Sequence, residues 1–293
     1  MIETGKTSVL GESQLELISK PLALTEKEFA TVSALAREQF GLELGMGKEP
    51  LAAARLGKLM RKRGFKVFRD YYRHVQSDQT GEALVELIDE LTTNHTSFFR
   101  EPAHFDFLVH HVFADQARRV PMRIWSAACS TGEEPYTIAL MAREHLGAQS
   151  PVLPAILATD ISTRVLETAR EGIYRANRFQ DGVAPWLRKH LMRGEERWQG
   201  WYRMRPEILE MVHFRRVNLI EPLPDVGRFT VIFCRNVMIY FSRTTQEQLV
   251  NRLVACLEPG GYLFVGHSES LTGIQHGLQQ IQPAVYQKRG GKK

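Results

Sequence analysis

The segment WSAACSTGEEPYTIAL contains the residues whose types and spacing best suit the binding of a nucleotide-like ligand. Small side chains precede Gly132, and Glu133 and Glu134 then open a helix-like stretch. Small residues let a ligand approach the backbone, and a helix start offers N–H groups without helical partners. The G-x-G-x-x-G fingerprint is absent, and the two glutamates would repel a pyrophosphate. The pattern therefore favours a phosphate-free, positively charged cofactor such as S-adenosylmethionine, although the glutamates are equally consistent with complementation of the helix dipole.

A second candidate position is Asp160, which ends the apolar run AILATD. An acidic residue at the end of the second strand of an α/β sheet is where a ribose diol is usually held. The alternative is that Asp160 or Ser162 caps a helix that begins near Thr163. The sequence leaves both interpretations open.

Two further segments, TTNHTSFFREP and CRNVMIYF, combine polar and aromatic side chains. In the first, Phe98 and Phe99 either pack at a domain junction or line a ligand site. The second follows an apolar strand and places Arg235, Asn236 and Tyr240 near the carboxyl edge of the expected sheet, where ligands of such sheets bind. Tyr240 is also consistent with a core aromatic residue.

Short apolar or β-rich runs alternate with amphipathic stretches of helical length in the larger part of the chain. The expected strands are 122–128, 155–160, 229–236 and 262–268, and the expected helices include 134–146 and 244–257. This alternation predicts an α/β fold with a parallel, Rossmann-like sheet covered on both faces. The glycine-containing GWYRMRPEI lies in a segment, about 181–214, that interrupts the alternation. It predicts a small inserted antiparallel β-subdomain.

The first part of the chain is expected to be helical. Thr25 and Glu28 form the T-x-x-E pattern of a capping box before an apolar residue run with helical spacing. Further helical patterns follow up to Leu91. We therefore expect four parts along the chain: a flexible segment 1–24, a helical domain 25–91, a linker 92–104 and an α/β domain 105–289.

The composition, with 43% hydrophobic and 24% charged residues, is that of a globular protein. The net charge of +5 is compatible with nucleic acid, a membrane surface or an acidic protein as partner. No apolar run approaches the roughly 20 residues that cross a bilayer, and no secretory signal is recognisable. The widely spaced Cys129, Cys234 and Cys256 favour buried free thiols in a reducing compartment. We expect a cytoplasmic protein without a metal site.

Taken in order, TTNHTSFFRE, WSAACSTGEEPYTIA, ATDIS, VNL and CRNVMIYF closely resemble the chemotaxis receptor methyltransferase (CheR) family, and the resemblance covers about residues 25–288. It implies a helical domain, a methyltransferase domain that uses S-adenosylmethionine, and an inserted β-subdomain. The residues that the resemblance implies in cofactor binding are Asn94, Thr96, Arg100, Glu134, Asp160, Asn218, Leu219, Arg235 and Asn236. Arg100 and Tyr240 resemble the family residues closest to methyl transfer.

The implied reaction esterifies glutamate side chains of methyl-accepting chemotaxis receptors and releases S-adenosylhomocysteine. A solvated glutamate has a pKa of about 4.3 and is already ionised near neutral pH, so no general base is required. The basic residues Arg55, Lys58 and Lys62 share one face of a predicted helix and are expected to meet glutamate-rich receptor helices. The alternative is an ordinary solvated face.

In some members of the resembled family the β-subdomain binds a peptide tether at a receptor's carboxyl terminus, and MRGEERWQGWYRMR is the candidate region here.

The sequence leaves two other functions open. A nucleic-acid methyltransferase fits the positive charge, but no N-P-P-Y-type motif or nucleic-acid-binding module is recognisable, and we expect no nucleic acid partner. The second open function is that of a non-catalytic sensor, which binds S-adenosylmethionine or its product.

Overall fold

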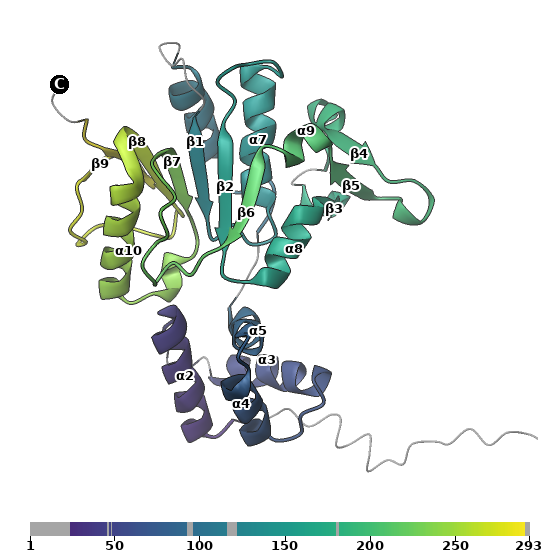
Figure 1. Cartoon of the computed structure of the whole chain (residues 1–293), viewed down its shortest axis with the longest axis vertical. Coiled ribbons are helices and arrows are strands. Elements are labelled where there is room, and N and C mark those ends of the chain that lie inside the picture. The colour runs from purple at the N-terminus through teal and green to yellow at the C-terminus, as the bar shows by residue number, and fades with distance from the viewer. Residues whose placement is uncertain are drawn as a thin grey trace, which may run out of the picture. The chain divides into compact units, whose positions relative to one another are not determined.

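The computed structural model describes residues 24–45, 47, 49–92, 96–115, 122–179 and 182–290. The chain divides into two compact units. Unit 1 comprises residues 1–34 and 44–92, and unit 2 comprises residues 35–43 and 93–293. Each unit is described separately below, with the elements labelled in Figure 1.

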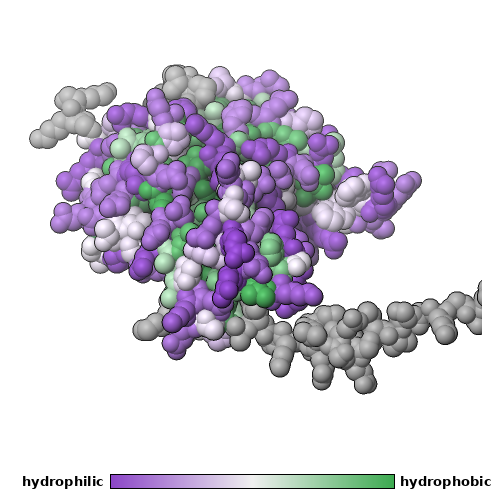
Figure 2. Space-filling view, turned by 60° about the horizontal axis from the view of Figure 1, so that its bottom comes forward, coloured by the Kyte–Doolittle hydropathy of each residue, from purple (hydrophilic) through white to green (hydrophobic). Residues whose placement is uncertain are grey.

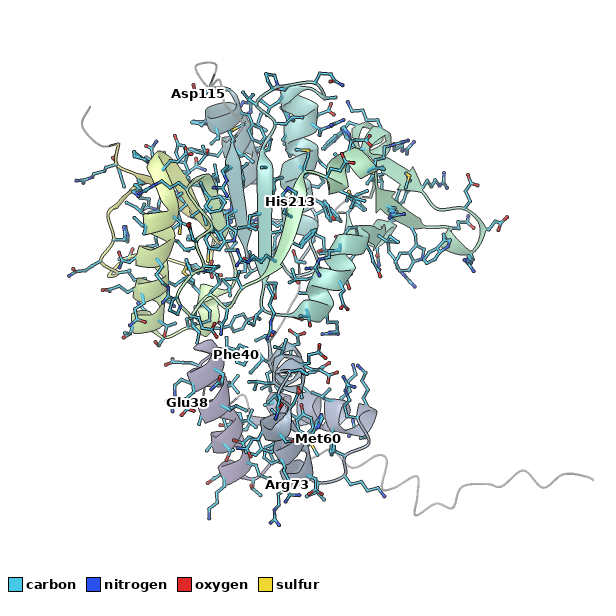
Figure 3. The ribbon with its side chains drawn as sticks, viewed as in Figure 1. Glu38, Phe40, Met60, Arg73, Asp115 and His213 are labelled. Carbon is cyan, nitrogen blue, oxygen red and sulfur yellow. The ribbon has the colours of Figure 1, made fainter. Side chains whose placement is uncertain are left out.

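Unit 1 is helical. Its elements are the first part of α2 (Glu26–Phe40), α3 (Glu49–Lys62), α4 (Phe68–Ser77) and α5 (Glu82–Leu91). The predicted capping box is confirmed, because the Thr25 N–H donates to Glu28 over 2.9 Å and the Glu28 N–H donates back to the Thr25 hydroxyl over 3.3 Å. Met60 is buried among the helices, whereas Arg73 points away from them into solvent (Figure 3).

The described part of unit 2 contains a sheet of seven strands in the order β6-β2-β1-β7-β8-β10-β9. The strands are β1 (Arg123–Ala127), β2 (Ala155–Asp160), β6 (Val212–Arg216), β7 (Phe229–Cys234), β8 (Leu257–Val265), β9 (Leu278–Gln282) and β10 (Val285–Lys288). The first five in spatial order pair in parallel, and the last two pair antiparallel. The apolar runs predicted four of the parallel strands, β1, β2, β7 and β8, but not β6. All six residues of β7 are buried, as expected of a central strand covered on both faces.

Helices follow three of the parallel strands: α7 (Glu133–Leu146) after β1, α8 (Thr163–Glu171) after β2 and α10 (Arg243–Cys256) after β7. A further helix, α6 (Pro102–Phe107), precedes β1. Phe233 of β7 and Phe264 of β8 stack with ring centroids 4.5 Å apart, and Phe105 of α6 lies 6.1 Å from Phe233. These rings therefore join α6 to the middle of the sheet, and α6 follows directly from the polar segment 96–101.

A second sheet in unit 2 has the strand order β3-β5-β4, all antiparallel, from Ile173–Arg175, Trp201–Met204 and Leu191–Arg193. The inserted β-subdomain is thus present, but its limits differ from the expected 181–214. Its first strand begins at Ile173, because Gly172 ends α8 in the left-handed conformation and leads directly into β3. At the other end, residues 212–214 belong to β6 of the main sheet.

Cys129 and Cys234 are buried and Cys256 is half-buried, and all three are free thiols. Burial raises the pKa of the Cys129 and Cys234 thiols well above the usual value, so both are protonated and unreactive. No helix in the described residues is long and apolar enough to cross a membrane. Polar side chains cover most of the face shown in Figure 2.

Candidate active site

The loop after β1, residues 128–132, forms the centre of the candidate site. The Cys129 N–H donates to the Thr159 carbonyl over 2.8 Å, and the Ser130 N–H donates to the Asp160 carboxylate, also over 2.8 Å. Gly132 has a φ of 94°, and a Cβ there would lie 2.8 Å from the Tyr174 hydroxyl. The loop is therefore held against the end of β2 by its hydrogen bonds, while Tyr174 and Ala169 leave no room for a side chain at Gly132.

Backbone strain concentrates in the same region. Seven non-glycine residues of the described chain have positive φ, and five of them lie in the loop after β1 or in the segments next to it. These five are Phe99, Glu101, Ala128, Ser130 and Asn236. Such conformations cost of order 1–3 kcal/mol each and cluster at functional sites. Their location supports the carboxyl edge of the sheet as the site.

The structure assigns the cap of α8 to Ser162 and shows the contacts of Asp160. The Ser162 hydroxyl accepts from the Val165 N–H and is the N-cap of α8. Asp160 instead accepts from the Ser162 N–H over 3.1 Å and from the Ser130 N–H. The Asp160 carboxylate thus joins the β1 and β2 loops, where a ribose would bind.

Glu133 and Glu134 begin α7, and both are paired with arginines. Glu133 is fully buried and forms an ion pair with Arg178. Glu134 accepts from the Ser126 hydroxyl over 2.7 Å and pairs with Arg235 over 2.9 Å. The charge of both glutamates is therefore largely compensated within the protein. The repulsion of a pyrophosphate inferred from the sequence is weaker than expected.

Arg235 is the buried centre of this edge, with a side chain only 2% exposed. Its guanidinium donates to Glu134, to the Arg100 carbonyl over 2.6 Å and to Glu101 over 3.0 Å. Because protein acceptors surround it, the side chain has little surface left for a ligand. We expect Arg235 to position Glu134 and the segment around Arg100.

Glu101 connects the linker segment to two other loops. One carboxylate oxygen accepts from the Asn236 side chain over 3.3 Å, and the other accepts from the His267 N–H over 3.2 Å. Burial raises the pKa of Glu101, but the charge of Arg235 and the hydrogen bonds outweigh it, so the net direction is downward. Glu101 is therefore ionised in the folded protein.

His104 lies three residues after Glu101 and is completely buried. Burial, reinforced by the charge of Arg235, lowers the pKa of His104 to about 3. Its Nδ1 is 3.5 Å from the Glu101 carboxylate, and neither ring nitrogen has a hydrogen bond within the described residues. His104 is thus a neutral imidazole inside the protein.

Replacing His104 with leucine is expected to flatten the pH dependence of stability on the acid side. The unfolded chain, with a histidine pKa near 6.5, binds the proton before the folded chain does. The free energy of unfolding of the wild-type protein should therefore fall by about 2 kcal/mol between pH 7 and pH 5 because of His104. This contribution should be absent in the His104→Leu variant. Urea denaturation at the two pH values measures the difference. His213→Leu, which changes an exposed histidine of β6 (Figure 3), should retain the wild-type dependence.

Asn218 and Leu219 follow β6. The Asn218 side chain donates to the Gln39 carbonyl over 3.1 Å and to Glu221 over 2.9 Å. Leu219 is buried, and its carbonyl accepts from Arg252 over 2.7 Å. The structure thus fixes the backbone of this loop at the carboxyl end of β6.

The remaining predicted site residues lie in the linker and after β7. Asn94 is outside the described residues. Thr96 and Arg100 are half-buried, and Phe98 is core, since it is fully buried and stacks on Phe179 with centroids 4.2 Å apart. Tyr240 is half-buried at the end of a short 3-10 turn, Met238–Tyr240, and its carbonyl accepts from the Glu43 N–H. The tyrosine is therefore not a core residue.

The basic side chains of α3 have different surroundings. Arg55 is half-buried and donates to the Leu91 and Thr92 carbonyls at the end of α5 over 2.9 and 3.1 Å. Lys58 is exposed, and Lys62 is exposed but lies 3.5 Å from Glu86. Arg55 thus differs from the solvated residue that the helical spacing suggested, because it caps the end of a neighbouring helix.

Sequence reasoning missed Glu101, Glu269 and Arg178, which hold the site together. Glu269 accepts backbone N–H groups from two loops, and Arg178 donates to Glu133. Glu101 stands next to Arg100 in the quoted FREP motif and could have been considered. Glu269, in GHSES, lies far from every other motif in the sequence, and only the folded structure reveals its partners.

Two family models match the chain. The all-alpha domain of CheR methyltransferase matches residues 27–92, and the SAM binding domain of CheR methyltransferase matches residues 94–286. The chemotaxis protein methyltransferase of Salmonella typhimurium is 39% identical over 97% of this chain and 96% of its own length. The chemotaxis protein methyltransferase of Escherichia coli is 39% identical over 96% of this chain and 96% of its own length. That of Borreliella burgdorferi is 38% identical over 90% of this chain and 95% of its own length. The chain therefore belongs to the CheR methyltransferase family and is a methyltransferase that depends on S-adenosylmethionine.

Proposed function

We propose that this chain esterifies glutamate side chains on the helices of chemotaxis receptors, with S-adenosylmethionine as the methyl donor, and so adjusts receptor signalling in the cytoplasm. The observation that carries the proposal is the pair of loops joined by Asp160 and Ser130 at the carboxyl edge of the sheet. A carboxyl group beside a small-residue loop suits a ribose and a cationic cofactor. The glutamate substrate is already ionised near neutral pH and needs no general base, and the imidazole of His104 is buried away from any incoming substrate.

The donor set fits the cofactor. Two acidic groups lie at this edge, Glu134 in the first turn of α7 and Asp160 at the end of β2, and the loop after β1 lacks the phosphate-binding glycine pattern. We propose that these two groups, the polar side chains of the linker and the loops after β6 and β7 hold the cofactor. The residues of those loops are Asn94, Thr96, Arg100, Asn218, Leu219 and Asn236. When bound, the cofactor supplies an electrophilic methyl group on a positively charged sulfur.

The protein's contribution to the reaction is alignment. The glutamate oxygen must approach the methyl carbon opposite the sulfur, and positioning of this kind can lower a barrier by about 7–11 kcal/mol. We propose that Arg100 orients the incoming carboxylate and that Tyr240 donates a hydrogen bond near the reacting groups. The backbone of both residues is anchored, through the Arg100 carbonyl to Arg235 and the Tyr240 carbonyl to the Glu43 N–H.

The receptor-facing surface that we propose is the exposed basic part of α3 and the following loop. Of the three basic residues predicted to face the receptor, we retain Lys58 and Lys62, which are exposed. Arg55 is left out because its side chain donates to a carbonyl at the end of α5. Arg61, Lys66 and Arg69 are exposed nearby in the sequence. A cationic surface would steer glutamate-rich helices toward the enzyme and fix their orientation.

The β-subdomain supports a second receptor contact, a carboxyl-terminal peptide. Both β3 and β4 are edge strands of the small sheet, and an edge strand can accept an added strand from a peptide. Met192 on β4 and Trp198 after it are exposed, at 37% and 45%. These side chains would contact the alternate residues of a bound peptide.

The deciding experiment combines the protein with radiolabelled S-adenosylmethionine and membranes that contain chemotaxis receptors. Label on the receptor that alkali releases as methanol is the expected result, because esters are base-labile whereas methylated amines and bases are not. Cofactor binding without label would favour the non-catalytic sensor. Base-stable label on nucleic acid would favour the nucleic-acid methyltransferase.

The same assay tests the basic surface. Lys58→Glu together with Lys62→Glu should raise the receptor KM about tenfold at low salt, with a smaller effect at high salt, because salt screens exposed charges. Arg289→Glu, an exposed arginine after β10, changes one charge in the same sense and should leave KM nearly unchanged. Equal KM values in the variant and the wild-type protein at low salt would exclude this surface.

A further inference from the structure

Glu269 joins two loops at the carboxyl edge of the sheet. It is 8% exposed, and its carboxylate accepts four hydrogen bonds from backbone N–H groups in the described chain. One oxygen accepts from Asn236 over 2.8 Å and from Gly266 over 2.6 Å. The other accepts from Met238 over 2.7 Å and from Ile239 over 3.3 Å. Three of the donors lie after β7 and one lies after β8.

The segment after β7 that donates three of these hydrogen bonds is short and strained. Asn236 has a positive φ of 60°, and the 3-10 turn that follows contains three residues, Met238–Tyr240. N–H groups at the start of so short a turn have no acceptor within it and need one from elsewhere. The Glu269 carboxylate supplies that acceptor. Without it, the strained Asn236 conformation would lose its principal support.

The two loops are also packed closely together. A Cβ at Gly266 would overlap the Asn236 side chain and lie 2.8 Å from the Glu269 carboxylate. The next residue, His267, donates its backbone N–H to Glu101 over 3.2 Å, and the side-chain amide of Asn236 donates to the same carboxylate over 3.3 Å. The loop after β8 therefore organises both the Asn236 turn and the linker residue next to Arg100.

We propose that Glu269 is a positioning residue for methyl transfer, which fixes the turn that presents Asn236 to the cofactor and Tyr240 to the reacting groups. The inference rests on the proposed function. Glu269 itself lies beneath the turn and acts through the backbone. Its removal should therefore affect turnover more than receptor recognition.

Glu269→Gln is the appropriate variant because it keeps the shape of the side chain. The amide replaces one acceptor oxygen with an NH₂ donor, which faces two of the backbone N–H groups. We expect kcat to fall about 30-fold, within the 10²-fold range that small misplacements produce, while the receptor KM changes by less than about threefold. Amide hydrogen exchange should increase at residues 236–239 and 266, with little change elsewhere in unit 2.

The control must lose comparable hydrogen bonds away from the site. Arg123→Met removes two bonds from the Arg123 guanidinium to the Val226 and Arg228 carbonyls, at the opposite end of β7. It should keep wild-type kcat at a temperature where circular dichroism shows both variants folded. An equal loss of kcat in Arg123→Met, or near-normal kcat in Glu269→Gln, would overturn the proposal.

Failure of the proposed function gives a different pattern. In that case the wild-type protein labels no receptor, and the exchange measurement and the affinity for S-adenosylhomocysteine still report on Glu269. Faster exchange confined to the two loops, with weaker binding of S-adenosylhomocysteine in Glu269→Gln, would support the positioning role. Unchanged exchange and unchanged affinity would refute it.

Discussion

Arg235→Met should lower the free energy of unfolding by roughly 3–5 kcal/mol, the usual cost of removing one partner from a buried ion pair. The variant keeps much of the aliphatic volume but leaves Glu101 and Glu134, each 13% exposed, without their shared cation. It also frees the Arg100 carbonyl. Urea denaturation at pH 7 measures the change, and calorimetry should show weaker binding of S-adenosylhomocysteine.

Arg228→Met is the matched control for this prediction. Arg228 also donates to main-chain carbonyls, those of Ala255 and Leu257, over 3.3 and 3.2 Å, but it is exposed. Its replacement should lower the free energy of unfolding by about 1 kcal/mol, the typical net contribution of such a hydrogen bond. If the two variants were equally stable, Arg235 would not be the centre of the buried network that its contacts indicate.

Arg100→Ala and Tyr240→Phe should each slow methyl transfer by about 10²–10³-fold, comparable to the loss of one donor that stabilises a transition state. Tyr240→Phe removes only a hydroxyl group, so the fold and the affinity for S-adenosylhomocysteine should change little. Single-turnover rates with receptor membranes measure the chemical step directly. The expected signature is a lower rate constant with a nearly unchanged KM.

A suitable comparison is Tyr202→Phe, which removes a hydroxyl group from the half-buried Tyr202 of β5 in the small sheet. That variant should retain the wild-type single-turnover rate. Normal turnover in both Arg100→Ala and Tyr240→Phe would show that neither side chain acts at the reacting centre. Methyl transfer would then depend on alignment by other groups in the site.

Local sequence patterns predicted most of the helices and parallel strands, because residue spacing within each segment determines whether it forms a helix or a strand. The Thr25–Glu28 capping box and the parallel strands β1, β2, β7 and β8 follow from residue spacing and apolar runs. The early start of the small sheet was missed, because Gly172 both ends a helix and begins a strand. Short strands of three residues carry too little periodicity to be recognised.

The surroundings of charged residues could not be predicted in the same way. Helical spacing placed Arg55 on an exposed face, whereas its partners are carbonyls contributed by α5. The acceptors around Arg235 come from two distant parts of the chain, Glu134 at the start of α7 and the adjacent Arg100 and Glu101 before α6. Sequence identifies which residues gather at the edge of the sheet, but not which of them touch one another.

The position of β1 in the sheet has a consequence for the time at which the site appears during synthesis. β1 pairs with β2, which follows it closely, and with β7, which is translated much later. Pairing between segments so distant in sequence slows folding. The β1 loop and Asp160 leave the ribosome long before the turn that carries Asn236. Until β7 has been synthesised, one edge of β1 lacks its partner strand, and an unpaired strand edge of this kind favours aggregation.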